Sequence, residues 1–418
     1  MPTGSADVLT RRLDRLRATG RPGGQPWPTE RPDHASALAE AVGGQVARSA
    51  AGAIVSVAYT FELPVDVPAL ATLPYPIAAD RPLVCLDLET TGLATAAGTL
   101  AFLIGLGFWD GDRLTVRQLL LPDHADERAL LDALAEVLPA DAWLVTYNGR
   151  SFDWPLLVAR FRLHRRDPPP FAGHLDLLHV ARQLWKHRLG NARLATVEDA
   201  VCAVVRDGDL PGALIPERYF GYLRSRRAEL LRDVVEHNRQ DIISLGLLLA
   251  VLTRFASPDA WPALHPGDLA GLARAFSNRG LLVESVRAIE AALAAEAWSR
   301  GVIDGARIHR HLSAERARLL ARLGRRADAH AAWLDICRRG GPGAAIAWLH
   351  VARHREHVER DLAGALAACR EAAAIAERAR AWDRPMAAVE SDLARRMPRL
   401  RRKSFARRAV SGGVGRAA

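Results

Sequence analysis

The sequence predicts a mixed α/β domain followed by an all-α region. Between about residues 81 and 255, short apolar segments alternate with amphipathic ones, as expected when strands and helices alternate. Three prolines interrupt the chain at 257–267, and beyond them it is rich in alanine with helical periodicity. A chain of 418 residues, 49% of them hydrophobic, is long enough for two or three domains. We therefore divide it into an N-terminal extension (1–80), an α/β domain (81–256), a helical region (268–392) and a basic tail (393–418).

The α/β domain is expected to begin with three strands and to continue with alternating helices and strands. Asp110–Gly111 is a tight-turn signal, which makes the second and third strands antiparallel neighbours. Ser151 is the expected N-cap of the helix that follows the fourth strand. The predicted strands are 83–86, 100–109, 114–121 and 143–147, and the predicted helices are 127–138, 151–164, short stretches within 180–222, and 228–252. This order predicts a mixed sheet, three antiparallel strands plus parallel ones, flanked by helices.

The N-terminal extension divides into an expected helix, a break and a strand pair. Val8–Ala18 has the pattern of a short amphipathic helix, and Gly20–Pro28 is rich in glycine and proline. Gly43–Leu63 has the pattern of two strands joined by a turn. No residue of the extension carries a motif for chemistry.

The helical region shows a weak internal repeat. Gly280–Val286, Gly324–His330 and Arg360–Leu366 resemble each other, and their matched small residues are separated by 44 and 36 positions. Tetratricopeptide-like repeats of paired helices recur at roughly 34 residues, with small residues where the helices cross. An irregular helical bundle is the alternative. A repeat of this kind could also bind a protein partner.

Composition favours a cytoplasmic protein with no membrane span. The N-terminus has no apolar stretch of signal-peptide length. The longest apolar run, Leu100–Trp109, is far shorter than the roughly 20 residues that cross a bilayer. The four cysteines include no CxxC pair, so we expect reduced thiols rather than a disulfide framework or a zinc site.

The positive charge is concentrated at the C-terminus. The net charge is +10, and the segment after Asp392 has nine basic residues and no acidic one, so the rest of the chain is nearly neutral. The basic stretch Arg395–Arg408 could contact phosphates, or it could be a solubilising end. The sequence leaves both interpretations open.

Acidic residues at the ends of predicted elements form the candidate site. Asp87 and Glu89 are two residues apart on a strand, so both carboxylates face one side and a divalent cation would relieve their repulsion. Asp153 falls in the first turn of a helix that follows another strand. His237 and Asp241 lie one helical turn apart. Taken singly, these residues are also explained by a solvated strand end, a helix dipole and a polar helix stripe.

The complete motif set resembles a known family. Three segments are similar to the three motifs of the DEDD 3′–5′ exonuclease superfamily, and the chain looks most like the YprB-type ribonuclease H-like family of bacterial proteins. The resemblance covers roughly residues 40–255. The three motifs are Leu86–Leu93, Tyr147–Asp153 and His237–Asp241, and further support comes from His174–His179, Leu184–Lys186, Arg193–Glu198 and Ile215–Phe220.

The resemblance implies a ribonuclease H-like fold and a 3′–5′ exonuclease that acts on DNA or RNA. Asp87, Glu89, Asp153 and Asp241 would be catalytic ligands of two Mg²⁺ or Mn²⁺ ions, which activate a water and stabilise the phosphoryl transition state. We also expect a catalytic role for His237. The backbone at Thr90 and Thr91 would approach the terminal nucleotide, and Asn148 would either stand near the scissile phosphate or only shape its loop. His174 and Asp176 match family positions, and we expect them to support the sheet rather than bind metal.

One position departs from the family pattern. One branch of the superfamily has histidine five residues before the last aspartate, and the other has tyrosine four before it. Here His237 stands four before Asp241, and Glu236 stands five before it. His237 therefore takes the direction of the tyrosine, because one position rotates a helical side chain by about 100°. This departure puts the catalytic rate in question more than metal binding.

Two rival functions remain at this stage. The domain could be a catalytically inactive module that still binds nucleic acid, although a phosphate-binding surface gains nothing from four carboxylates. The helical repeats could instead be the main functional part, as a protein-interaction scaffold.

Overall fold

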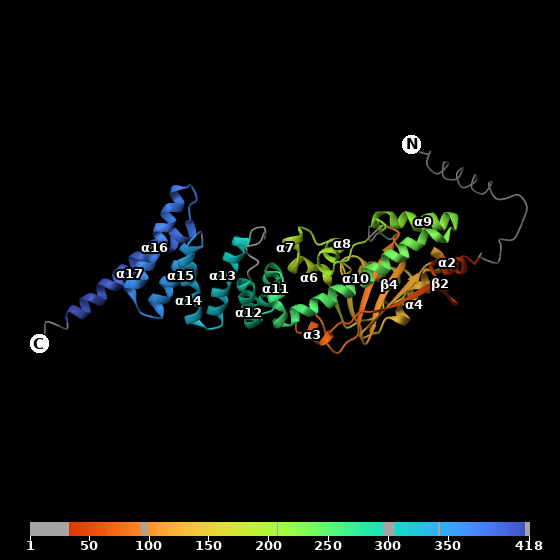
Figure 1. The fold of residues 1–418 in the computed structure, drawn as a ribbon, viewed down its shortest axis with the longest axis horizontal. Coiled ribbons are helices and arrows are strands. Elements are labelled where there is room, and N and C mark those ends of the chain that lie inside the picture. The colour runs from red at the N-terminus through yellow and green to blue at the C-terminus, as the bar shows by residue number, and fades with distance from the viewer. Residues whose placement is uncertain (1–32, 93–97, 207, 296–304, 342, 414–418) are drawn as a thin grey trace, which may run out of the picture.

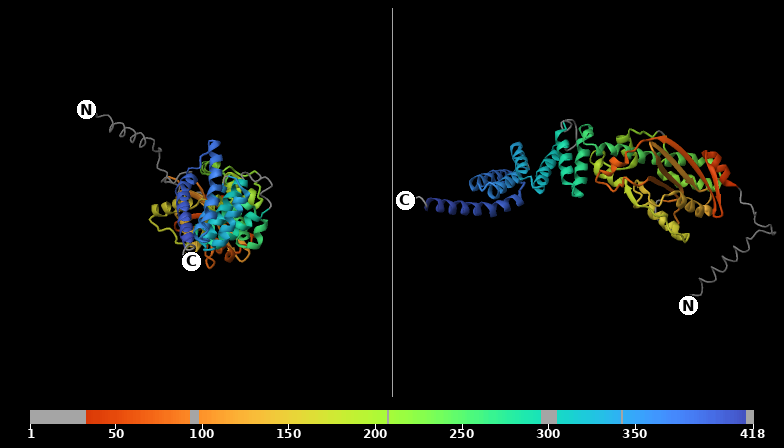
Figure 2. Two further views of the ribbon diagram at one scale, coloured as in Figure 1. Left: turned by 90° about the vertical axis from the view of Figure 1, so that its left-hand side faces the viewer. Right: turned by 90° about the horizontal axis from the view of Figure 1, so that it is seen from below.

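The computed structural model describes residues 33–92, 98–206, 208–295, 305–341 and 343–413. The molecule is elongated, with a sheet domain at one end and successive helices that continue toward the other (Figures 1 and 2). This arrangement confirms the predicted fold class, a mixed α/β domain followed by an all-α region. The helix expected at Val8–Ala18 and the break at Gly20–Pro28 lie outside the described residues.

One sheet of seven strands forms the core of the first domain, in the order β1-β2-β5-β4-β3-β6-β7. The central strands β3, β4 and β5 are antiparallel, and β6 and β7 continue the sheet in parallel with β3. These pairings match the predicted order of three antiparallel strands followed by parallel ones. The strands are β1 (Gln45–Ser49), β2 (Gly52–Glu62), β3 (Leu83–Thr90), β4 (Ala101–Asp110), β5 (Arg113–Leu120), β6 (Trp143–Thr146) and β7 (Gly173–Asp176).

The expected strand pair at 43–63 belongs to this sheet. Strand β2 pairs with β5 along its length, from Val55 opposite Leu120 to Glu62 opposite Arg113. A division of the chain near residue 80 would therefore cut through a continuous sheet. The sequence shows two strands here, but it does not show which edge of the sheet they join.

Helices cover both faces of the sheet. Alternate residues of β3 enter different cores: Cys85 packs in the cluster that contains Ile242 of α10, and Leu86 packs in the cluster that contains Leu130 of α4. Asp87 and Glu89 continue the Cys85 row, so the strand period directs both carboxylates to the α10 face. The helices are α2 (His34–Val42), α3 (Val67–Ala71), η1 (His124–Asp126), α4 (Glu127–Val137), α5 (Asp153–Leu163), α6 (Leu177–Leu184), α7 (Lys186–Leu189), α8 (Leu194–Val197), η2 (Glu198–Cys202), η3 (Gly212–Leu214), α9 (Ile215–Ser225), η4 (Ala228–Leu231) and α10 (Arg232–Ala256).

The start of α5 differs from the prediction. The helix begins at Asp153, its N-cap position is Phe152, and no side chain caps it. Ser151 lies in the preceding turn, so its expected role as N-cap is wrong. Asp153 is nevertheless in the first helical turn, as predicted.

The expected linker at 257–267 is packed rather than open. Most of it forms η5 (Pro258–Ala263), where buried Trp261 donates its Nε1–H to the carbonyl of Phe255 at 2.9 Å. Helix α11 (Pro266–Asn278) then lies against α6 so closely that a Cβ on Gly271 would be 2.4 Å from the carbonyl oxygen of Gln183. The two parts of the chain are therefore joined by a tight interface.

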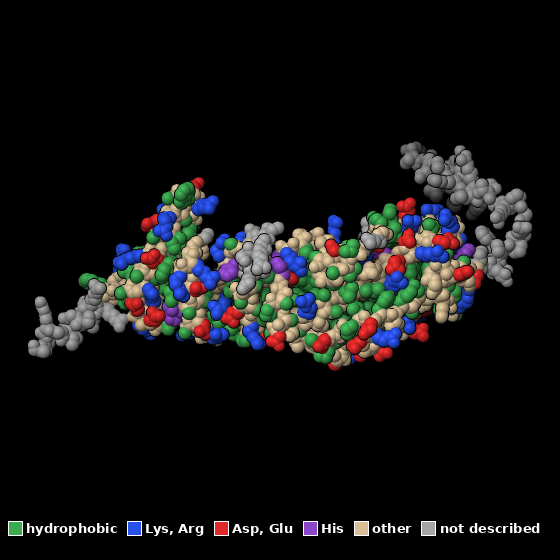
Figure 3. Space-filling view, in the orientation of Figure 1, with side chains coloured by type: hydrophobic (Ala, Val, Ile, Leu, Met, Phe, Trp, Pro, Cys, Tyr) green, Lys and Arg blue, Asp and Glu red, His purple; other side chains and the backbone are tan. Residues whose placement is uncertain are grey.

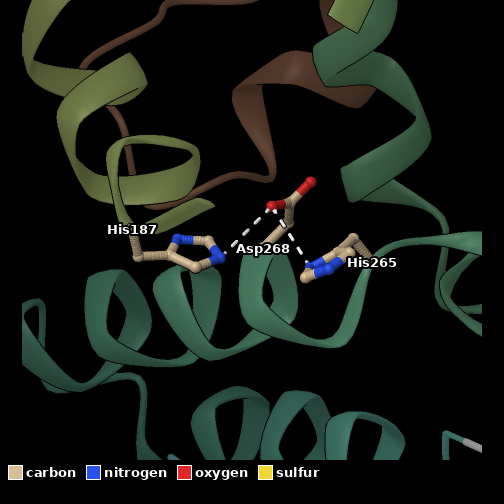
Figure 4. A group of neighbouring side chains, drawn as sticks. All are labelled: His187, His265 and Asp268. Atoms are coloured by element: carbon tan, nitrogen blue, oxygen red, sulfur yellow. Dashed lines mark ion pairs between the residues drawn. The ribbon is translucent and has the colours of Figure 1, made fainter. Parts of the chain in front are cut away.

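An ion pair strengthens this interface. Buried Asp268 of α11 accepts hydrogen bonds from Arg188 at 3.0 and 3.2 Å. The rings of His187 and His265 approach the same carboxylate, at 3.7 and 3.9 Å (Figure 4). Arg188 already binds both oxygens of Asp268. We therefore interpret the cluster of Asp268 with its arginine and histidine neighbours as a structural contact between the two parts of the chain.

The described part of the C-terminal region contains three helical hairpins. The three similar sequence segments occupy equivalent places, each at the turn between paired helices. Gly280, Gly324 and Arg360 all have positive φ, and the matched small residues Ser285, Ala329 and Ala365 are buried at the helix crossings. These features support the predicted repeat, while its tetratricopeptide type stays a prediction. The helices are α11, α12 (Leu282–Ala294), α13 (Gly305–Arg322), α14 (Arg326–Arg339), α15 (Ala344–His357), α16 (Leu362–Ala381) and α17 (Ala387–Gly413).

The basic tail is not a separate segment. Its described part, up to Gly413, lies in α17, which buries Leu393 and Leu400 against the preceding helices. The buried carboxylate of Glu356 accepts hydrogen bonds from three of the basic residues of the tail, Arg396, Arg399 and Lys403. These three charges thus stabilise the helical region, and α17 runs through the boundary predicted at residue 393.

Within the described residues, no helix is both long enough and apolar enough to cross a bilayer.

Candidate active site

Strand β3 and helix α10 bring three of the predicted acidic residues together. Asp87 and Glu89 project from the carboxyl end of β3, and Asp241 faces them from α10. Potential ligand atoms of Glu89, Asp241 and His237 all lie within 4.8 Å of one another. Glu89 is only 8% exposed, so its carboxylate is held in a largely dehydrated site.

Asp153 enters the site from the next strand. β6 lies beside β3, and Asp153 is the first residue of the helix that follows β6. Gly149 is required at the turn between them, because a Cβ there would be 2.8 Å from Oδ2 of Asp153. Asp176 secures the same turn by accepting hydrogen bonds from the backbone N–H groups of Asn148, at 2.7 Å, and Arg150, at 3.3 Å.

Asp176 and His174 lie at the end of β7 and hold neighbouring groups. Asp176 also caps α6 by accepting from the N–H of Leu178 at 3.0 Å. Nε2 of His174 is 2.9 Å from the hydroxyl of Thr146. These contacts agree with the expectation that both residues support the sheet.

The four carboxylates repel one another in a site with little water. Burial, followed by the charge of Asp241, raises the pKa of both Asp87 and Glu89 well above the usual range. The pKa of Asp153 is raised to about 7 by burial and by the charges of Asp176 and Asp241, and burial also raises the pKa of Asp241. Four hard oxygen donors whose ionised forms are disfavoured in this way suit a divalent cation such as Mg²⁺ or Mn²⁺. The residues present therefore fit the metals that the sequence predicts.

Without metal, this repulsion makes stability depend on pH. The pKa of Asp153 is raised from 3.8 to about 7, so the stabilisation from its bound proton is fully present below 3.8 and is lost as the pH rises through about 7. In EDTA, we expect Asp153→Asn to have a higher melting temperature than the wild type, and the difference should grow as the pH rises from 5 to 8.5. Melting temperatures of the two proteins across this range test the prediction, and a difference that does not change with pH would contradict it.

His237 has two carboxylate neighbours. Its Nδ1 is 2.7 Å from Oδ1 of Asp209, and its Nε2 is 3.6 Å from Oδ2 of Asp241. In the neutral ring, a proton on Nδ1 that is donated to Asp209 leaves the lone pair of Nε2 directed toward the acidic group. Burial opposes the ionisation of Asp209, but hydrogen bonds from His237 and Arg206 hold its pKa below the usual range. The structure thus gives His237 an orienting partner that the sequence did not suggest.

Comparison with known proteins agrees with this arrangement of strands and carboxylates. Residues 84–253 match the RNase H superfamily. These residues form a ribonuclease H superfamily domain. Over 182 residues, the chain is 40% identical to "Uncharacterized protein YprB" of Bacillus subtilis (strain 168), a match that covers 43% of this chain and 44% of that protein. The similarity is consistent with the predicted YprB-type family, and it spans less than half of the relative.

Asn238 is a further residue of the ribonuclease H domain site, and it is not among the residues predicted from the sequence. Its side-chain N–H donates to Oδ2 of Asp87 at 2.9 Å, and its oxygen accepts from Nε2 of Gln118 at 2.9 Å. Asn238 and Gln118 are both fully buried. Gly105 makes room for them, since a Cβ there would be 2.3 Å from Oδ1 of Asn238. The one available signal was a glutamine within the apolar strand 114–121.

Arg206 is the second residue that sequence reasoning missed. Its guanidinium forms a two-point contact with the fully buried carboxylate of Glu198 and lies 2.5 Å from Oδ1 of Asp241. It also donates to Asp209 at 3.0 Å. Arg206 therefore balances part of the acidic charge of the ribonuclease H domain. In a chain with so many arginines, nothing in the sequence distinguished this one.

The three residues predicted to contact substrate lie at the edge of the same site. Thr90 donates its hydroxyl proton to the carbonyl of Gly92 at 2.8 Å, and the hydroxyl of Thr91 accepts from the N–H of Leu100 at 3.1 Å. Asn148 has a left-handed backbone with φ of 70°. All three shape the loops around the acidic residues, and their contact with a nucleotide stays a prediction.

Proposed function

We propose that the ribonuclease H domain hydrolyses phosphodiester bonds of DNA or RNA with the aid of two Mg²⁺ or Mn²⁺ ions. The observation that carries this proposal is the convergence of four mutually repelling carboxylates from β3, α5 and α10. A site of this kind is unfavourable in an empty protein and becomes favourable when cations bind. The superfamily match supports a nuclease-type domain.

The proposed roles follow from the positions of the side chains. Asp87, Glu89, Asp153 and Asp241 would hold the ions, and Asn238 would keep Asp87 oriented toward them. When bound, the ions would neutralise phosphate charge and make a water more acidic. His237 would accept a proton at Nε2, while Asp209 holds its Nδ1–H. The terminal nucleotide would contact Thr90, Thr91 and Asn148.

We further propose that cleavage proceeds from the 3′ end. The motif resemblance supports this direction. The location we propose is the cytoplasm, which fits the four free cysteines.

The direct test of activity uses single strands of DNA and RNA labelled at the 5′ end. With Mn²⁺, the wild type should shorten them stepwise to a ladder of labelled products, and EDTA should abolish the reaction. Immediate release of a labelled mononucleotide would show the opposite direction. Absence of cleavage with Mn²⁺ on both DNA and RNA, in single-stranded and duplex form, would contradict the proposal.

One contact favours a second candidate function, a catalytically inactive module that binds nucleic acid. Arg206 lies against Asp241, a position where a cation would otherwise compensate the charge. A permanent arginine contact would leave the metal set incomplete. Replacing Arg206 tests whether this contact competes with a cation for Asp241.

We expect Arg206→Gln to destabilise the metal-free protein and to increase its response to Mn²⁺. Glu198 is fully buried, and breaking a buried ion pair by removing one partner costs about 3–5 kcal/mol. A cation would then no longer compete with Arg206 for Asp241, so the rise in melting temperature with Mn²⁺ should exceed that of the wild type.

The Glu198→Gln/Arg206→Gln variant is the matched control. It removes both partners and should recover much of the lost stability while keeping the larger Mn²⁺ response. A smaller Mn²⁺ response in Arg206→Gln than in the wild type would show that Arg206 and the cation do not compete.

A further inference from the structure

A hollow of about 490 Å³ lies between α13, α14 and α15, in the helical region outside the ribonuclease H domain. Its lining includes four arginines and four histidines, and none of its lining residues is Asp or Glu. We call it the arginine pocket and define it by Arg318, Arg322, Arg326 and Arg353. Arg318 and Arg322 lie on α13, Arg326 is the first residue of α14, and Arg353 lies on α15.

The single sign of charge is unusual on this surface. Basic and acidic side chains intermingle along the face drawn in Figure 3. Hollows elsewhere on the chain contain carboxylates: Glu290 and Asp335 line one, and Glu377 and Glu390 line another. A general excess of arginine in this chain would affect all of these hollows equally. The arginine pocket therefore reflects the local arrangement of helices rather than the overall composition.

Its arginines are available for a ligand. Arg318 pairs with Glu315, but no ion pair within the described residues involves Arg322, Arg326 or Arg353. All four are exposed. A guanidinium presents a planar set of donors that matches phosphate oxygens, so three arginines without an ion-pair partner favour a phosphate-bearing ligand.

Two stacked pairs of rings form part of the pocket lining. Trp333 and His350 stack at 4.1 Å with nearly parallel planes, and His330 and His354 stack at 4.0 Å. Nδ1 of His330 is buried without a hydrogen-bond partner among the described residues. Burial, together with the charges of Arg353 and Arg318, lowers the pKa of His350 to about 4, which is consistent with a positive field in the pocket.

A metal ion fits this group less well. His330 and His354 both approach Oε1 of Glu359, at 3.6 and 3.5 Å, which is a spacing that ligands of one ion could have. The two rings are stacked with an angle of 15° between their planes. An imidazole binds metal in its own plane, and two stacked parallel rings cannot both point to one ion.

We propose that the arginine pocket binds the phosphates of a single-stranded nucleic acid, as a second contact for the strand that the ribonuclease H domain cleaves. The choice of nucleic acid rests on the proposed function. The arginines around the hollow match the phosphates of a strand, as in the positively charged grooves that follow a single-stranded backbone. An acidic peptide is the competing ligand, and the experiment includes it.

The test compares full-length variants for binding to a labelled 30-nucleotide single strand in EDTA, where cleavage is prevented. Arg322→Gln/Arg326→Gln/Arg353→Gln removes three charges from the pocket. The control is Arg370→Gln/Arg378→Gln/Arg384→Gln, which removes three exposed charges of the helical region outside the pocket. Equal melting temperatures establish that both variants are folded.

We expect the pocket variant to bind about tenfold or more weakly than the wild type, and the control to bind nearly as the wild type does. The plot of log affinity against log salt concentration should be less steep in the pocket variant, with a slope smaller in magnitude by about 2. Three phosphate contacts are lost, and about 0.7 counterion is released for each contact. Equal losses in both variants, or none in the pocket variant, would overturn the proposal. Polyglutamate and unlabelled strand are compared as competitors at equal concentrations of negative charge. If polyglutamate displaces the labelled strand more effectively, the nucleic-acid proposal is overturned in favour of an acidic peptide.

The same proteins separate this inference from the proposed nuclease. Cleavage by the wild type with Mn²⁺, combined with unchanged binding by the pocket variant in EDTA, would refute only the second contact. Binding that is lost only in the pocket variant, without any cleavage by the wild type, would refute only the nuclease.

Discussion

The Asp87→Asn/Glu89→Gln variant should cleave nucleic acid at least about 10³-fold more slowly than the wild type and should melt at a higher temperature in EDTA. The loss of rate follows because bound cations contribute several kcal/mol to the transition state, and each 1.4 kcal/mol is a factor of ten. The gain in stability follows because both carboxylates are buried beside like charges, which raises the pKa of each. The amide oxygen that the change introduces at position 87 can still accept a hydrogen bond from Asn238.

Melting curves with EDTA and with Mn²⁺ check this pair of effects. The order of melting temperatures should reverse when Mn²⁺ is added, because the wild type gains more stability from the cation than the variant does. Asp110→Asn/Asp112→Asn removes two exposed charges at the β4–β5 hairpin and is the matched control. The account is contradicted if the acidic-site variant gains as much from Mn²⁺ as the wild type does.

His237→Ala should reduce turnover by roughly 10²–10⁴-fold, the usual contribution of a general base. Mn²⁺ affinity should stay near that of the wild type if the histidine acts as a base rather than as a ligand. Asp209 lies 2.7 Å from Nδ1, so Asp209→Asn should cause a smaller loss by releasing the ring from its orientation. Asp241→Ala should weaken metal binding and turnover together.

Two further variants define the role of His237. His237→Tyr places tyrosine at the position used by one branch of the superfamily and should recover part of the rate. Glu236→Gln changes the neighbouring position, where the side chain is 58% exposed, and should leave the rate unchanged. Cleavage by His237→Ala at the wild-type rate across pH 6 to 9 would mean that the histidine is structural.

Local periodicity predicts which acidic residues share a face, and the resemblance to known motifs is what selects them as a site. The strand period places Asp87 and Glu89 on one face, and the helical period places His237 and Asp241 on another. The order of elements then predicts that the ends of β3 and β6 are neighbours, which brings in Asp153. These are short-range regularities, and the structure follows them.

The contacts that complete the site are long-range and have no local pattern. Gln118 and Asn238 are 120 residues apart in sequence, and their hydrogen bond depends on how α10 crosses the sheet. Arg206 reaches Asp241 from a loop 35 residues away. The pairing of β2 with β5 and the burial of α17 were missed for the same reason, since both depend on which surfaces remain uncovered after the local elements form.

The most direct test of the metal site is a calorimetric titration of Mn²⁺ into the metal-free wild type and into the Asp87→Asn/Glu89→Gln variant, without nucleic acid. The account predicts two Mn²⁺ ions for each wild-type chain at pH 8, with weaker binding below pH 7 as Asp153 takes up its proton. It predicts that the variant loses at least one of these sites. The same stoichiometry and affinity in both proteins would contradict the assignment of Asp87 and Glu89 as metal ligands.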